Sequence, residues 1–150
     1  MELHPAAPSA TTLLHLDEPR ARVLGNGSDD DRIDDWYLDS GATHHMTGRR
    51  EFFSDLDTVG GSVRFGDSSA VEIKGVGSVI FTAKSGEHRM LTGVYYIPAL
   101  RNSIISLGQL DESGSRVVID SGVLRIWDHR RQLLARVVRG KNRLYILHVG

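Results

Sequence analysis

Residues 36–46 of the chain read WYLDSGATHHM, and this stretch is the strongest indication of the fold. Three apolar residues lead to Asp39, which is followed by the turn-forming pair Ser40-Gly41. Glycine lets two backbones approach closely, and a serine hydroxyl can close a turn by hydrogen bonding. The pattern therefore predicts a short buried strand that presents a carboxylate at a turn, which makes Asp39 a candidate acid–base group.

A second Asp-Ser-Gly sequence occurs in VVIDSGVL, residues 117–124, where the acid is Asp120. Aspartic proteolysis uses two carboxylates that share one proton, supplied by two lobes of one chain or by two identical chains. Only residues 123–150 follow the second turn, and they contain neither a second hairpin with a glycine-rich tip nor a second capped helix. We therefore interpret the second Ser-Gly pair as an ordinary hairpin turn, Asp120 as structural and Asp39 as the catalytic candidate.

Outward from this stretch, the sequence consists of short segments rich in β-branched and aromatic residues, separated by turn-forming residues. VRFGDSSAVEI, residues 63–73, predicts a hairpin with a polar tip. Strands are expected in residues 36–38, 63–65, 71–73, 76–81, 91–97, 117–120, 123–127, 132–138 and 143–149. The predicted fold class is all-β.

One short helix is predicted over residues 106–113, SLGQLDES. Ser106 followed by Gln109 is a capping-box pattern, and Gly114 can close the carboxyl end. The sequence contains no long helical pattern and no internal repeat.

The 150 residues suffice for one domain with tails. Residues 1–33 contain three of the four prolines and an acidic run, which predicts a linker or a disordered segment. The barrel is expected over residues 34–115, and residues 116–150 are expected either to complete it or to form a separate small sheet. The chain has no cysteine and no apolar stretch long enough to span a bilayer, so we expect an intracellular, cytoplasmic protein without a membrane partner.

Four stretches in one order carry a family resemblance: WYLDSGATHHMTG, VRFGDSSAVEIKGVGSV, GVYYIPALRNSIISLGQL and NRLYIL. Together they resemble the Pol polyprotein of copia-type (Ty1/copia) LTR retrotransposons of plants. The resemblance covers about residues 34–148 and falls on the protease region and the pre-integrase segment. It implies a small retropepsin-like β-barrel with a flap hairpin and one short helix, followed by a short antiparallel β segment.

The resemblance also implies an activity: an aspartic endopeptidase that cleaves the Gag-Pol polyprotein as a homodimer, within a virus-like particle if the element is intact. Each subunit would supply one catalytic turn, Asp39, Ser40 and Gly41. The residues implied to support the active site are Ala42, Thr43, Ile104 and Ile105. Those implied to form the flap and contact the peptide are Phe65, Gly66, Asp67 and Ser68. No metal and no cofactor are implied.

The sequence departs from the retropepsin pattern at Ser106, where a glycine often follows the apolar run. It also lacks the cysteines of the zinc knuckle that lies upstream of the protease in such polyproteins. We therefore expect the chain to be a fragment of a longer gene. The alternative function is a non-catalytic β-barrel interaction module from a decayed or truncated element.

His44 and His45 next to the turn raise the question of a metal site. Adjacent histidines of a strand point to opposite sides, and no further ligands lie at metal-binding spacing, so we expect none. A serine-hydrolase pairing of Ser40 with His45 lacks the nucleophile turn that such sites use. If His45 lies close to Asp39, its charge would lower the pKa of that carboxylate, and this hypothesis is left open.

The C-terminal segment is basic, with seven Lys or Arg residues and one acid from Val123 onward. Nucleic acid is therefore a second candidate partner. The alternation Leu133-Ala135-Val137 favours the simpler interpretation of an antiparallel sheet whose arginines face solvent.

Overall fold

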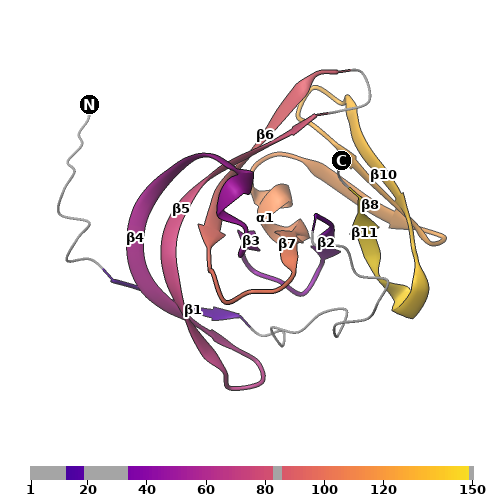
Figure 1. Ribbon diagram of the computed structural model, residues 1–150. Coiled ribbons are helices and arrows are strands. Elements are labelled where there is room, and N and C mark those ends of the chain that lie inside the picture. The colour runs from indigo at the N-terminus through magenta and orange to yellow at the C-terminus, as the bar shows by residue number, and fades with distance from the viewer. Residues whose placement is uncertain (1–12, 19–33, 83–85, 149–150) are drawn as a thin grey trace.

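The computed structural model describes residues 13–18, 34–82 and 86–148, which are predominantly β with one short α-helix (Figure 1). An eight-stranded sheet has the order β1-β4-β5-β6-β3-β7-β2-β11, and a three-stranded sheet has the order β10-β9-β8. The all-β class predicted from the sequence is confirmed. The large sheet contains β1 (Leu13–Glu18), β2 (Trp36–Asp39), β3 (Met46–Thr47), β4 (Phe53–Phe65), β5 (Ala70–Thr82), β6 (His88–Tyr96), β7 (Ser103–Ser106) and β11 (Tyr145–Leu147). The other elements are α1 (Leu107–Glu112), β8 (Arg116–Asp120), β9 (Val123–Trp127), β10 (Leu133–Val138) and the 3₁₀ turns η3 (Arg50–Phe52) and η4 (Lys141–Arg143).

The long strands β4 and β5, with β6, curve around the centre of the molecule, where β3, β7 and α1 lie (Figure 1). The curvature has a local cause, because the β4–β5 pairing shifts register between Thr58 and Gly61 and the β5–β6 pairing shifts between Gly77 and Val79. An extra residue on one strand bends that strand and increases its twist. Gly77 is required at its shift, since a Cβ there would clash with the carbonyl oxygen of Asp55.

The buried apolar side chains form two clusters, which we call the C-terminal cluster and the hairpin cluster. The C-terminal cluster joins the two sheets and contains Trp36, Leu38, Phe53, Val79, Val94, Ile105, Leu107, Leu110, Leu124, Ile126 and Val137. The hairpin cluster contains Tyr37, Ala42, Met46, Val63, Phe65, Ile73, Ile97, Leu100 and Ile104. Successive residues of β2 and of β7 alternate between the clusters, as expected where a strand is buried on both faces.

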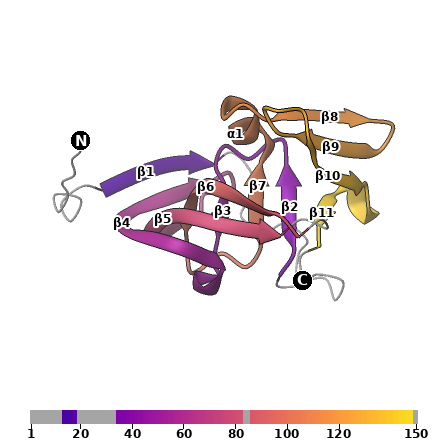
Figure 2. The ribbon, with the colours of Figure 1, turned by 90° about the horizontal axis from the view of Figure 1, so that it is seen from above.

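Residues 116–148 are divided between the two sheets. β8, β9 and β10 form the small sheet, and the β8–β9 hairpin lies beside α1 (Figure 2). β11 returns to the large sheet and pairs antiparallel with β2, from Tyr145 opposite Leu38 to Leu147 opposite Trp36. The predicted inward alternation is wrong at Leu133, which is 52% exposed, because the β10–β9 register shifts between Leu133 and Ala135.

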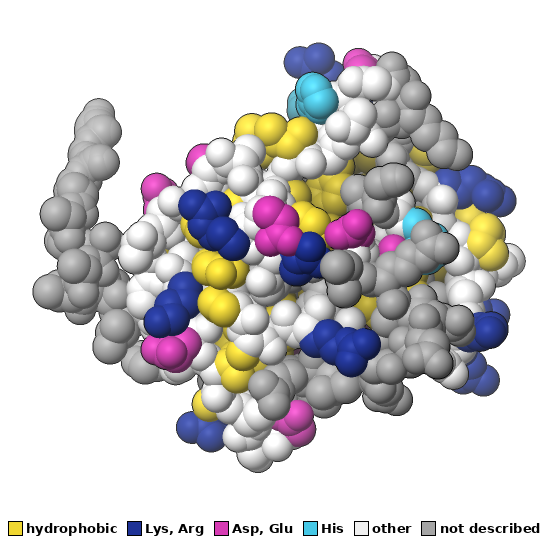
Figure 3. Space-filling model, viewed as in Figure 1, with side chains coloured by type: hydrophobic (Ala, Val, Ile, Leu, Met, Phe, Trp, Pro, Cys, Tyr) yellow, Lys and Arg dark blue, Asp and Glu magenta, His cyan; other side chains and the backbone are white. Residues whose placement is uncertain are grey.

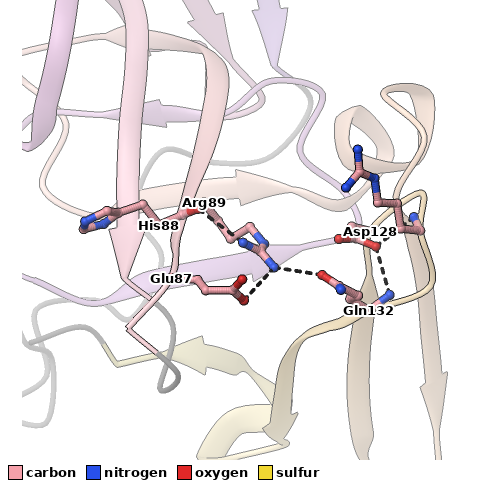
Figure 4. Close-up of polar contacts among 6 residues, drawn as sticks. Glu87, His88, Arg89, Asp128 and Gln132 are labelled. Carbon is pink, nitrogen blue, oxygen red and sulfur yellow. Dashed lines mark hydrogen bonds and ion pairs between the residues drawn. The ribbon is translucent and has the colours of Figure 1, made fainter.

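A polar bridge also connects the sheets. Arg89 of β6 donates hydrogen bonds to Glu87 Oε1 at 3.2 Å and to Gln132 Oε1 at 3.0 Å, across to the turn between β9 and β10 (Figure 4). Asp128 closes that turn by accepting from the backbone N–H of Gln132 at 2.9 Å. This hydrogen bond is the largest cause of the lowered pKa of the Asp128 carboxyl.

The structure differs from the predicted linker within residues 1–33. Leu13–Glu18 forms β1, which pairs in parallel with β4 from Leu13 opposite Gly60 to Glu18 opposite Phe65. The rest of that segment lies outside the described residues. The only indication of this strand in the sequence was its short apolar run, and such a run does not show which strand it pairs with.

The predicted helix is confirmed as α1, but its amino-terminal capping differs from a capping box. Ser106 Oγ accepts from the backbone N–H of Gln109 at 3.0 Å, as predicted. The Gln109 side chain does not return to Ser106 and instead bonds to His45, in the loop after Asp39, and to Gly93 of β6. Among the described residues, no helix is long and apolar enough to cross a membrane.

Candidate functional site

Asp39 is held at the end of the buried strand β2. The four residues of β2 are all buried, and Asp39 is 7% exposed, whereas the following Ser40 is exposed. The backbone N–H of Gly41 donates to Asp39 Oδ1 at 2.7 Å, which closes the turn on its own carboxylate. The carboxylate is therefore oriented locally and lies next to an exposed loop.

β7 packs beside β2 and supports this turn. The two strands run in parallel with Tyr37 opposite Ile104 and Asp39 opposite Ser106. Ile104 lies in the hairpin cluster with Ala42, whereas Ile105 lies in the C-terminal cluster. The predicted support residues Ile104 and Ile105 therefore lie on opposite faces of β7, and only Ile104 shares a cluster with the turn.

Ser106, the departure from the glycine pattern, joins three parts of the site. Its backbone N–H donates to His45 Nδ1 at 2.9 Å, and its hydroxyl donates to the carbonyl oxygen of Ala42 at 2.7 Å. The same hydroxyl accepts from Gln109 N, as described above. A glycine could make only the first of these bonds, so Ser106 connects the turn after Asp39 to the start of α1.

Gln109 fixes the far end of the same loop and was not predicted as a site residue. Its Oε1 accepts from the backbone N–H of His45 at 2.9 Å, and its Nε2 donates to the carbonyl oxygen of Gly93 at 3.2 Å. Gln109 is 64 residues from His45 in the sequence, so no local pattern indicates the contact. The glutamine was visible only as part of a helix cap.

The two histidines have different environments. His45 is 2% exposed, and burial lowers its pKa to about 4, with a smaller contribution from the charge of His44. Because Nδ1 accepts from Ser106, the neutral ring carries its proton on Nε2. At neutral pH the ring of His45 is therefore uncharged, and the hypothesis of a charged His45 acting on Asp39 applies only to acidic pH.

His44 turns to other partners, with Nδ1 2.7 Å from the hydroxyl of Thr43 and its ring edge-on to Tyr95. Within residues 13–18, 34–82 and 86–148, no group of three or more His, Cys, Asp or Glu side chains is placed to hold a metal ion. His45 Nδ1 is taken by a backbone donor, and no hydrogen bond between His45 and Ser40 is found in that part of the chain.

Thr43 is tied to the amino-terminal strand. Glu18, the last residue of β1, is 2% exposed, and its Oε2 accepts from Thr43 N at 2.8 Å and from Thr43 Oγ1 at 3.1 Å. Glu18 lies in the segment predicted as a linker, and no sequence signal indicated that it reaches the site. It is the second site residue that the sequence did not reveal.

The predicted flap residues form the tip of the β4–β5 hairpin. Phe65 N donates to the carbonyl oxygen of Ser69 at 2.8 Å, and Asp67 Oδ1 accepts from Ser69 N at 2.9 Å. Ser68 has a φ of 72°, the left-handed conformation that a tight turn requires. Gly66, Asp67 and Ser68 are exposed, whereas Phe65 is buried in the hairpin cluster with Ala42.

Asp120 has none of these surroundings. It is exposed and pairs with Val123 across a two-residue turn in which Ser121 and Gly122 have φ values of 53° and 80°. Positive φ at both central positions is typical of a type I′ hairpin turn. The predicted hairpin turn is therefore present, and the two Asp-Ser-Gly sequences have different local structures.

A small hollow opens beside the Asp39 turn. Its volume is about 150 Å³, and its lining includes Asp39, Ser40, Leu107, Arg143 and Tyr145. Arg143 lies in the turn η4, just before β11 pairs with β2, so the carboxy-terminal segment contributes a cation to the surroundings of Asp39. This residue was predicted only as part of a basic segment.

The fold and the site define a small, curved all-β domain in which the carboxylate of Asp39 is held at the end of a buried strand. The family model of the Pol polyprotein beta-barrel domain matches residues 36–115, and the chain belongs to this family. It is similar to the retrovirus-related Pol polyprotein from transposon TNT 1-94 of Nicotiana tabacum, with 32% identity over 81 residues. That match covers 53% of the chain but 6% of the tobacco protein, so the chain corresponds to a small part of its relative. The resemblance to the Pol region of a copia-type element is thus supported.

Proposed function

We propose that this domain is an aspartic endopeptidase of a retrotransposon polyprotein and that it works as a homodimer. The observation that carries the proposal is the carboxylate of Asp39, held by Gly41 N at 2.7 Å at the end of a buried strand and beside the exposed Ser40. Phe65, at the end of β4 and next to the hairpin tip of residues 66–68, packs in the hairpin cluster together with Ala42. A turn and a flap are therefore both anchored in the hairpin cluster.

In the proposed mechanism, Asp39 of each subunit faces its counterpart across a water molecule. The two carboxylates share one proton, because like charges about 3 Å apart cannot both ionise. The ionised group takes a proton from the water, and the protonated group polarises the carbonyl of the scissile bond. No step needs a metal or a cofactor.

A second copy is needed because, within the described residues, only the turn at Asp39 has the required surroundings. Asp120 belongs to a type I′ hairpin of the small sheet and lacks the supporting contacts of Asp39. Both Ser40 and the hollow that includes Arg143 are at the surface, where a second chain could approach Asp39. The polyprotein substrate would bind as an extended strand under the flap.

The experiment is cleavage of a Gag-Pol precursor by the purified chain at mildly acidic pH. We expect Asp39→Asn to abolish cleavage and the matched change Asp120→Asn to leave it unchanged, because asparagine can still accept from Gly41 N but cannot act as an acid. A folded wild-type chain that does not cut the precursor, or an Asp39→Asn chain that still cuts it, would contradict the proposal.

A non-catalytic module that binds nucleic acid is the alternative, and the distribution of charge favours it over other non-catalytic roles. Figure 3 shows basic and acidic side chains interspersed on much of the visible face, with basic ones along the margin at the small sheet. The exposed basic residues of this part are Arg116, Arg130, Arg131, Arg136, Arg139, Lys141 and Arg143. This role predicts an affinity for nucleic acid that falls steeply with salt and with charge reversal at Arg130 and Arg131.

A further inference from the structure

β1 occupies the edge of the sheet next to the proposed flap. It pairs in parallel with the half of β4 that leads to the hairpin tip, and Glu18 lies opposite Phe65. β5 pairs with the other side of β4, and β1 is the outermost strand of the large sheet. Without β1, this part of β4 would be an open edge that presents unpaired backbone groups to another strand.

Among the side chains of β1 that the structure describes, those of Leu16 and Glu18 hold the strand against the rest of the domain. Leu16 packs against the hairpin cluster, whose members include Ala42 and Phe65. Glu18, two residues further and therefore on the same face of the strand, accepts two hydrogen bonds from Thr43. Thr43 lies four residues after Asp39 in the same loop, so β1 spans from the flap strand to the active-site turn.

We propose that Leu13–Glu18 is an internal ligand of the peptide groove, and this inference rests on the proposed function. The groove takes an extended peptide that pairs with the flap strand, with an aliphatic side chain on the hairpin cluster and, two residues later, a carboxylate on Thr43. Backbone pairing together with side-chain pockets at alternate positions is how peptides bind by strand addition. β1 has each of these features.

The anchor is suited to displacement. Within the described part of the chain, Glu18 Oε2 makes both bonds to Thr43, and no hydrogen bond reaches the buried Oε1. The carboxylate thus loses contact with water without filling all its acceptor positions, which weakens its net contribution. A tethered strand nevertheless acts at an effective concentration in the millimolar range, so an external peptide binds weakly until β1 is released.

The test measures the affinity of a fluorescent peptide, TTLLHLDEPR, copied from residues 11–20, for the full chain. All chains carry Asp39→Asn, so that cleavage cannot affect the reading. We expect Glu18→Ala to bind the peptide at least about tenfold more tightly than its parent, because the charged anchor of the competing strand is lost. The matched control Glu72→Ala, at an exposed position of β5, should bind it like the parent.

A second arm examines the peptide itself. The Glu18→Ala chain should bind a peptide carrying Glu18→Gln at least about tenfold more weakly than the unchanged peptide. Equal affinities in either arm would overturn the inference. A Glu18→Ala chain without native circular dichroism would also overturn it, because β1 would then be an indispensable strand of the fold.

The outcome can be separated from that of the proposed function. Binding is read in chains without an active Asp39, so a groove that binds peptide is detected even if the native chain cuts nothing. A protein that binds as expected but shows no Asp39-dependent cleavage would refute the protease and retain the groove. A protease that cuts but binds the peptide equally with and without Glu18 would refute the internal ligand alone.

Discussion

At the residue scale, the site depends on buried polar groups whose partners lie far away in the sequence. Ser106 connects to Ala42 and His45, and Gln109 connects to His45 and Gly93. Buried donors and acceptors without partners cost about 1–3 kcal/mol each, so this network selects one conformation of the loop after Asp39. The loop is held by β7 and α1 together.

The protonation of His45 predicts how stability varies with pH. The ring has a pKa of about 4 in the folded chain, against 6.5 ordinarily, because burial disfavours the charged form. Between pH 6.5 and about pH 4 the unfolded chain binds more protons than the folded chain. The free energy of unfolding therefore falls as the pH is lowered through this window, and the contribution of His45 is fully present above pH 6.5. The contribution of this one group is about 3 kcal/mol.

Urea unfolding at pH 7 and at pH 4.5 measures this effect. Wild type should lose more stability between the two pH values than His45→Asn, whose Oδ1 lies at the same place along the side chain as Nδ1 and can accept from Ser106 N–H but does not titrate. An equal loss of the free energy of unfolding in the two proteins would show that the protonation of His45 does not cause the pH dependence.

Local sequence patterns were sufficient for some of these residues and insufficient for others. The turn at Asp39 and the Ser121-Gly122 turn were predicted because turns form from residues that are adjacent in the sequence. Glu18 and Gln109 were missed as site residues, since their contacts with Thr43 and His45 arise from the packing of separate strands. The effect of burial on His45 likewise requires the fold.

At the element scale, the curved hairpin of β4 and β5 requires glycine where the strands approach most closely. A Cβ at Gly77 would collide with the backbone of Asp55, whereas a Cβ at Gly108 of α1 would have 3.8 Å to its nearest neighbour, the Ser106 hydroxyl. The sequence predicted both strands from their β-branched residues. It did not predict their 13-residue lengths or the register shifts, because those depend on the pairing.

Alanine at these two glycines should therefore have opposite effects. Gly77→Ala should lower the free energy of unfolding by about 1–3 kcal/mol, since backbone must move to accept the methyl group. Gly108→Ala should raise it by about 0.5–1 kcal/mol through helix propensity. Chemical denaturation of both variants measures the difference, and a neutral Gly77→Ala would contradict the close approach.

At the scale of the whole molecule, the two sheets share one core. Leu124 of β9 is fully buried in the C-terminal cluster together with Trp36 and Leu38 of β2. β11 adds a backbone pairing from the carboxy-terminal segment to β2, so the segment expected after the barrel supports the strand that carries Asp39. The sequence left open whether this segment belongs to the barrel because it shows strands and not their partners.

The substitution Leu124→Ala tests whether the two sheets share one core. In a Trp127→Phe background, the remaining tryptophan, Trp36 of β2, reports on unfolding at the large sheet's side of the shared core. We expect Leu124→Ala to lower the stability seen by Trp36 fluorescence by about 2–5 kcal/mol, as for other buried leucines. The control Ile119→Ala, at a position of β8 that is 48% exposed, should change it by less than about 0.5 kcal/mol. An unchanged Trp36 transition in Leu124→Ala would mean that the small sheet unfolds independently.

The most direct test of the dimeric protease is cleavage of the precursor by wild-type chains mixed with Asp39→Asn chains at constant total concentration. If each active dimer needs an Asp39 from both subunits and the subunits exchange freely, an equal mixture retains about one quarter of the wild-type rate. Asp120→Asn mixed in the same way should retain the full rate. A rate of about one half in the Asp39→Asn mixture, which independently active monomers would give, would contradict the account.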